Sequence, residues 1–142
     1  MIDIENKVLD TVFAAVRTSF ANAQCYGEYV AVPAAFPCVC LWEANSTTYK
    51  PSRDDSLQEH QANLMYECNV YSDKANGHKA EARSIAKIVD ATMQSMKFTR
   101  TFMQAIPNLD RTIYRMTLRW EAVAGEPITT DGEKITYQMY RK

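Results

Sequence analysis

Residues 63–123 carry the one continuous pattern that most restricts the fold of this chain. A strand is predicted at 63–72, where apolar side chains alternate with mixed ones. After a polar turn, apolar residues recur at helical spacing over about 78–96. Two β-prone runs, 98–106 and 111–123, flank a short connection and predict an antiparallel hairpin. Together these segments predict a β-sheet with one face covered by helix.

The last β-prone run shows the difference between its two faces most clearly. Alternate positions share a face in a strand, so one face of this run is apolar and the other is polar. The apolar face is Tyr114, Met116, Leu118, Trp120 and Ala122, and the polar face is Arg115, Thr117, Arg119 and Glu121. We expect the first face to pack on helices and the second to meet water or another subunit.

The N-terminal third predicts a second helix and a buried strand. Apolar side chains fall on one stripe of a helix over about residues 4–22, with Asp3 as its N-cap and Gly27 in the breaker region after it. A short β-prone run follows at 29–32, and a strand with apolar side chains on both faces is predicted at 38–44.

Residues 45–62 are strongly polar and predict a loop of eighteen residues. Loops of this length in compact domains are usually functional or mobile, so we expect it to take part in contacts between subunits. Its acidic residues could pair with arginines of another copy, although such a cluster in a loop is usually only solvated. If the loop reaches a neighbour, its two large hydrophobic residues would anchor it. The candidate interface residues in this loop are Tyr49, Arg53, Asp54, Asp55 and Leu57.

The C-terminal residues predict two turns and a last strand. Residues 125–127 and 131–132 have turn composition, and side chains alternate over 135–140. With 142 residues and 46% hydrophobic content, the whole chain, 1–142, is expected to form a single domain with one core.

Charge and apolar patterning point to a protein of the cytosol. The formal net charge of −1 gives no overall attraction to nucleic acid or to an anionic membrane. No apolar run is long enough to cross a bilayer, and the acidic N-terminus does not resemble a signal peptide. We therefore expect the four cysteines to be reduced thiols.

The sequence offers no catalytic, cofactor-binding or metal-binding constellation that we can assign. Cys38 and Cys40 with His60 or His78 could form a metal site, but zinc sites usually combine two ligand pairs and a second pair is missing. Cysteines within apolar runs are more often buried core thiols. No nucleophile elbow, P-loop or dinucleotide-binding pattern occurs, so we do not expect an enzyme.

Arginines gather on the C-terminal hairpin and allow three interpretations. They could form a solvated sheet face with cross-strand polar pairs, track a phosphate backbone, or meet Asp and Glu of a neighbouring copy. The near-neutral charge weighs against a dedicated nucleic-acid binder. The candidate interface residues here are Arg100, Arg111, Arg115 and Arg119.

Three sequence stretches carry a family resemblance. A Tyr-Glu-x-Asn-Val-Tyr-Ser strand lies within 64–72, a helix ends in Met-x-Phe at 96–98, and a Pro-Asn-x-Asp-x-Thr-Ile-Tyr-Arg hairpin starts at Pro107. With these stretches the chain resembles the small tail terminator or tail completion proteins of long-tailed bacteriophages. The resemblance covers about sixty residues, and neither the Cys38–Cys40 region nor residues 45–62 has a counterpart in it.

This resemblance implies an α+β fold: a single, mainly antiparallel β-sheet with two α-helices packed on one face. It implies a homo-hexameric ring at the head-proximal end of the tail tube, which ends tube polymerisation and provides the surface for joining the head. The implied partners are other copies of the chain, the tail tube protein and the head–tail connector protein, with no membrane and no cofactor. DNA would pass through the ring without sequence-specific binding. The implied location is the host cytoplasm during assembly and then the virion. The alternatives are another head–tail connector or neck protein, or a small nucleic-acid-binding α+β module.

Overall fold

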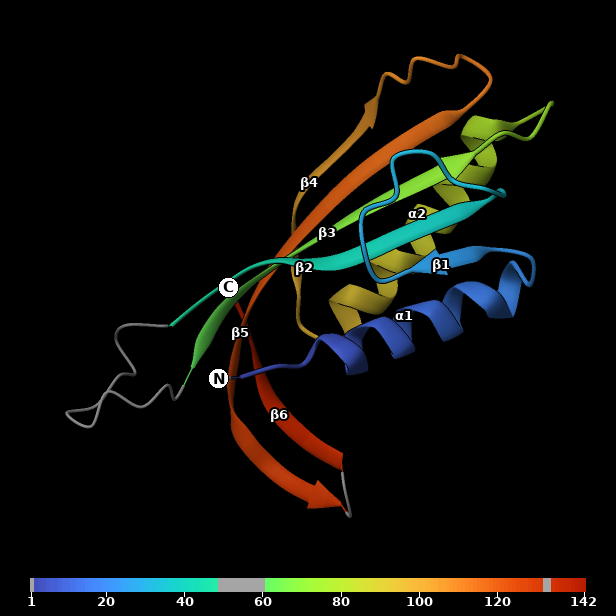
Figure 1. The fold of residues 1–142 in the computed structure, drawn as a ribbon. Helices are drawn as coiled ribbons and strands as arrows, with labels where there is room; N and C mark the ends of the chain where they lie inside the picture. The colour runs from blue at the N-terminus through green and yellow to red at the C-terminus, as the bar shows by residue number, and fades with distance from the viewer. Residues whose placement is uncertain (1, 49–60, 132–133) are drawn as a thin grey trace.

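The computed structural model describes residues 2–48, 61–131 and 134–142. These residues form two helices and six strands, which confirms the predicted α+β class (Figure 1). The elements are α1 (Glu5–Ser19), β1 (Gln24–Tyr26), β2 (Cys38–Thr48), β3 (Ala62–Ser72), α2 (His78–Ser95), β4 (Thr99–Ile106), β5 (Tyr114–Asp131) and β6 (Lys134–Arg141).

The strands form one mainly antiparallel sheet in the order β1-β2-β3-β5-β4, with only β1 and β2 parallel. Strand β6 also pairs with β5, starting where β4 stops: β4 pairs along β5 up to Glu121, and β6 pairs from Ala122 onward. Strands β4 and β6 therefore follow one another along the same edge of β5. The predicted hairpin of the 98–106 and 111–123 segments is confirmed.

Both helices pack on one face of the sheet, and the main core lies between them and the strands. Helix α1 contributes three buried valines to this core, and α2 contributes a stripe of mixed size: Ala82, Ile85, Ala86, Val89 and Met93. Their spacing places each set on one face of its helix. The helix-side core includes Val8, Val12, Val16, Ile85, Val89, Met93, Leu64, Tyr66, Cys68, Met116, Leu118 and Trp120. The predicted apolar face of β5 is thus buried against helix.

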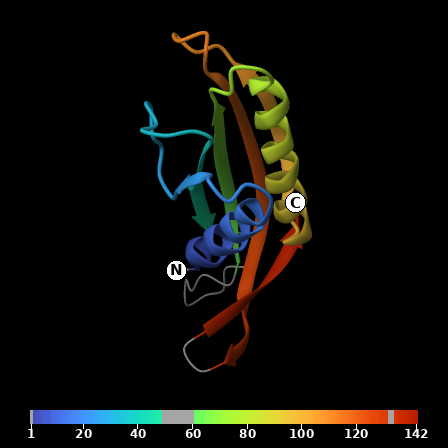
Figure 2. The same ribbon diagram turned by 90° about the vertical axis from the view of Figure 1, so that its right-hand side faces the viewer.

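A smaller cluster covers part of the opposite side of the sheet, which we call the outer face. Cys38, Cys40 and Tyr71 are buried there, and the chain that connects β1 to β2 packs over them through Val30 and Phe36. Figure 2 shows this connection on the side of the sheet away from α2. The cover extends across the sheet as far as β5, where Tyr29 of the same connection lies beside Arg115, and Ile113 from the β4–β5 connection also packs on this cluster.

The ends of the helices differ slightly from the predicted ones. Helix α1 ends at Ser19, three residues before the expected boundary, and its N-cap is Ile4. Asp3, the predicted cap, accepts a hydrogen bond from the backbone N–H of Glu5 at 3.1 Å. Helix α2 follows Gly77, which has a left-handed backbone with φ of 96°.

Three predicted segments require correction. The run 29–32 is not a strand; the short strand is β1, which pairs with Cys38–Cys40 in parallel. Residues 45–48 and 62 were expected in a loop but are paired in β2 and β3, and residues 49–60 lie outside the described part of the chain. The predicted turn at 125–127 is part of β5, which continues to Asp131 with register shifts on both sides of Pro127. A proline has no N–H for the ladder, so pairing becomes irregular there instead of ending.

The distal parts of β5 and β6 form an arm. In both ribbon views this two-stranded arm extends beyond the ends of α1 and α2 (Figures 1 and 2). No helix in the described part of the chain is long and apolar enough to cross a membrane.

Candidate interaction surfaces

The centre of the outer face is a polar row that crosses β3 and β5. The hydroxyl of Thr117 donates to Oδ1 of Asn69 at 2.6 Å, and Nε of Arg115 donates to the same oxygen at 3.2 Å. Asn69 is 1% exposed and Thr117 is 5% exposed. These two buried polar groups therefore have hydrogen-bond partners within the sheet, and the Asn69 oxygen also holds the Arg115 side chain.

Arg119 lies two residues farther along the same face. Its Nε donates to Oε1 of Glu67 at 2.7 Å, and its guanidinium lies 5.2 Å from the centre of the Phe102 ring. About half of the Arg119 side chain remains exposed. Part of this guanidinium is therefore accessible to a partner.

Arg115 is held more tightly. Its guanidinium lies 5.9 Å from the centre of the Tyr29 ring and 5.7 Å from that of Tyr71, so it contacts two aromatic rings. Burial raises the pKa of Tyr71 to about 12. The Tyr71 hydroxyl is buried and has no hydrogen-bond partner among the described residues.

The four predicted interface arginines do not form one patch. Arg115 and Arg119 share the outer face, as the alternation in β5 predicts. Arg100 instead pairs with Asp90 of α2 at 2.7 Å on the helix side, and Arg111 is exposed in the connection between β4 and β5. The five candidate residues of the loop, Tyr49, Arg53, Asp54, Asp55 and Leu57, lie outside the described residues, so their pairing with these arginines stays a prediction.

Sequence reasoning missed Asp90, which connects α2 to β5 and β4. Its Oδ1 accepts from Nε1 of the buried Trp120 at 2.9 Å, and its Oδ2 accepts from Arg100 at 2.7 Å and from Gln94 at 2.8 Å. The one available signal was a carboxylate beside the apolar stripe of an amphipathic helix. That signal does not reveal the indole, which lies thirty residues away.

Strand β4 provides an open sheet edge. Among the described residues it pairs only with β5, and its register is regular from Phe102 to Ile106. Proteins usually protect such edges with lysine, proline or a bulge. Strand β4 has little of this protection. Arg100 is its only charged residue, and its one register shift occurs near Thr101. The hydrophobic side chain of Met103 is 40% exposed. The Phe102–Ile106 edge is therefore suited to pairing with another chain.

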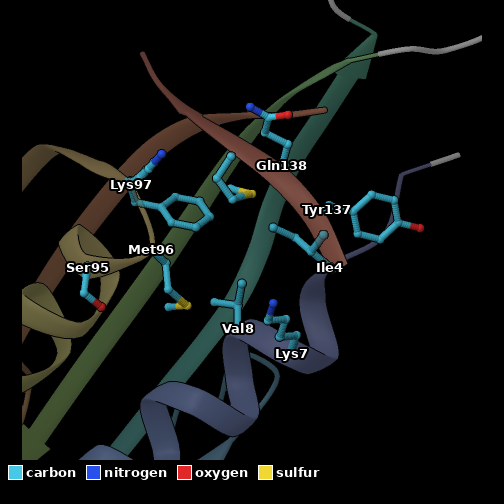
Figure 3. Close-up of a pocket in the computed structure, with 10 residues that line it drawn as sticks. Ile4, Lys7, Val8, Ser95, Met96, Lys97, Tyr137 and Gln138 are labelled. Carbon is cyan, nitrogen blue, oxygen red and sulfur yellow. The ribbon is translucent and has the colours of Figure 1, made fainter. Parts of the chain in front are cut away.

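A pocket of about 470 Å³ lies where β6 passes the N-terminal end of α1 and the C-terminal end of α2 (Figure 3). Apolar side chains make up much of its lining, including Ile4, Val8 and Met96, and Lys7 and Lys97 also contribute. Such a lining can accept an apolar side chain. The pocket has no cluster of groups suited to catalysis.

The cysteines are free thiols, three of them buried and Cys25 partly buried. The sulfurs of Cys38 and Cys40 are 3.9 Å apart; their hydrogen bond, together with burial, raises the pKa of the Cys38 thiol. Burial also raises the pKa of the Cys68 thiol.

Within the described residues, no group of three or more His, Cys, Asp or Glu side chains is arranged to hold a metal ion. His78 stacks near the Tyr114 ring, with 5.7 Å between ring centres, and His60 lies outside the described residues.

No protein-family model matches this chain, and a search of curated proteins finds no match.

Proposed function

We propose that this chain is a structural assembly protein: a tail terminator or tail completion protein that forms a hexameric ring at the head-proximal end of a phage tail tube. The observation that carries the proposal is the open β4 edge beside a partly uncovered outer face. A sheet edge of this kind exposes backbone donors and acceptors that another chain can satisfy.

The sheet offers two different ends, as a ring requires. Each copy in a closed ring presents one patch to the neighbour on one side and a different patch to the neighbour on the other. In this chain, β4 ends one side of the strand order and β1 ends the other. Contacts that join these unlike ends are heterologous and close into a ring when the rotation between copies allows it.

The arm and the outer face supply further surface for the tube and for the head connector. The arm extends beyond the helices, so it can reach a neighbour without moving the core. On the outer face, half of the Arg119 side chain is exposed next to Phe102. Arginine and aromatic residues are enriched at protein interfaces. The ring would match the last tube ring on one side and offer no further tube-binding surface on the other, which would stop polymerisation.

The test measures tube length and head joining. Particles that lack this chain should have tails of uncontrolled length that are not joined to filled heads, and purified chain added to polymerising tube protein should halt tube growth. Tails of normal length joined to filled heads in its absence would contradict the proposal. If the chain binds only the head-side adaptor and not the tube end, it is another connector or neck protein.

A further inference from the structure

The exposed side of α2 is cationic along one line. Lys79, Arg83 and Lys87 are all exposed and follow one another at intervals of four residues, so they lie on the same side of the helix. At 1.5 Å of rise per residue, neighbouring positions of the line are about 6 Å apart along the helix axis, and the three positions span about 12 Å. None of the three has an ion pair among the described residues.

Neither carboxylate of α2 forms an ion pair with a residue of this line among the described residues. Glu81 accepts a hydrogen bond from the Ser72 hydroxyl at 2.8 Å, and Asp90 is occupied by Trp120 and Arg100. The other exposed residues of the helix are small or uncharged: Ala80, Ser84, Ala91, Gln94 and Ser95. Like charges at this spacing repel one another and destabilise an isolated helix. An anion bound over the line reduces this repulsion.

The line leads to a cleft of about 160 Å³ between α2 and β4. Arg83 and Lys87 line the cleft from the helix, and Arg100 and Met103 line it from the strand. Asp90 is also part of the lining and holds Nη1 of Arg100 at 2.7 Å. A guanidinium has five N–H donors, so Arg100 keeps donors for a second acceptor while Asp90 fixes its orientation. With three cations and one carboxylate, the cleft keeps a net positive charge of two.

We propose that the α2–β4 cleft and the line that leads to it bind phosphate groups of a double-stranded DNA backbone. The line extends past the cleft to Lys79, so it covers more length than one isolated phosphate needs. The exposed residues of α2 include no aromatic side chain that could stack on a base, so binding would be independent of base sequence. This proposal does not depend on the ring, because a single copy carries the whole surface.

The experiment measures the fluorescence anisotropy of a labelled 20-base-pair duplex titrated with the full chain at several salt concentrations. Three or four phosphate contacts predict that log K falls with log salt at a slope of about −3 to −4, since each contact contributes about −0.9. The double variant Arg83→Gln/Lys87→Gln removes two contacts, so the slope should become shallower by about 2. Its affinity for the duplex should fall by about tenfold or more at low salt.

The matched control is Lys7→Gln/Arg17→Gln, which removes two exposed positive charges from α1 instead. It should bind the duplex with the slope of the unaltered chain. Equal losses in both double variants would show attraction by net charge alone and would overturn the proposal. Binding of a polyglutamate peptide without binding of the duplex would also overturn it, because the surface would then fit an acidic protein partner.

Two further measurements keep this result separate from the proposed function. Circular dichroism melting of both double variants checks that they fold, which substitutions of exposed lysines and arginines should permit. Native mass of the same samples reports assembly. A hexamer that does not bind the duplex refutes the DNA site alone, and a monomer that binds it supports the DNA site without the ring.

Discussion

At the scale of single residues, the side chain of Asp90 accepts three hydrogen bonds, one from β4, one from β5 and one within α2. The side chain is 15% exposed, and its donors are Arg100, the buried Trp120 indole and Gln94. Asp90→Ala would leave the indole N–H without a partner, and we expect the free energy of unfolding to fall by about 1–3 kcal/mol. Urea denaturation measures this change.

Asp90→Asn is the matched control for that substitution. The amide oxygen can still accept from the Trp120 indole, while the charge-assisted bond to Arg100 is lost, so the cost should be smaller than for alanine. Equal costs for the two variants would mean that the indole bond contributes little and that the carboxylate charge dominates.

Loss of the Tyr71 hydroxyl, unlike loss of the Asp90 carboxylate, is expected not to lower the free energy of unfolding. The hydroxyl is buried without a described partner, so Tyr71→Phe should leave stability at neutral pH unchanged or raise it by up to about 1 kcal/mol. A loss larger than about 1 kcal/mol would show that the hydroxyl has a hydrogen-bond partner after all.

The same residue predicts a pH dependence. The pKa of Tyr71 is raised to about 12, chiefly by burial, whereas an unfolded tyrosine ionises near pH 10. Between these values the unfolded state binds fewer protons than the folded state, so stability falls as pH rises. Stability measured by urea denaturation from pH 9 to 11.5 should therefore fall less steeply in Tyr71→Phe than in the unaltered chain. Equal slopes would show that Tyr71 is not the residue responsible.

At the scale of elements, the start of α2 depends on a left-handed glycine. Gly77 has φ of 96°, and a Cβ placed there would come no closer than 4.0 Å to Ala80. The cost of Gly77→Ala is therefore in the backbone: about 1–2 kcal/mol of strain, less about 0.4–1 kcal/mol from the reduced freedom of the unfolded chain. Gly77→Asn should cost less, because asparagine tolerates this conformation better than alanine. Denaturant unfolding of both variants tests this order, and an alanine variant as stable as the asparagine one would contradict it.

Long periodic elements could be predicted from sequence, and short or polar ones could not. Helix α2 and strand β3 lie within a residue of the predicted bounds because each has a clear apolar period. Strand β1 has only three residues and pairs in parallel with a strand twelve or more residues later, so no local pattern marks it. The polar end of β2 forms a strand because it pairs with the start of β3, and that pairing overrides its loop-like composition.

At the scale of the whole molecule, the sequence could predict some features of the candidate surfaces but not others. Alternation in β5 was enough to place Arg115 and Arg119 on one face, since it is a property of one strand. Which strand forms the edge depends on the order of strands in the sheet, and sequence reasoning could not give that order. For the same reason it could not show that Arg100 turns to α2 and away from the other arginines.

The last prediction concerns assembly through the open β4 edge. Gln104 is exposed and lies opposite Thr117 of β5 in the regular part of the edge. A lysine there would place a charge on a strand edge that is to be covered by another chain, which is how natural proteins prevent edge pairing. Gln104→Lys should therefore lower the fraction of hexamer in native mass measurements. Its free energy of unfolding as a monomer should change by less than about 0.5 kcal/mol, because the site is exposed.

Ser84→Lys on α2 is the control for this substitution, since it adds the same charge at an exposed helix position that lies near Phe20 of the α1 side. It should assemble like the unaltered chain. If Gln104→Lys also assembles fully, β4 is not covered by a neighbour in the ring, and the contact between copies must lie on the arm or the outer face. If both variants fail to assemble while remaining folded, repulsion by added net charge explains the loss and edge pairing does not.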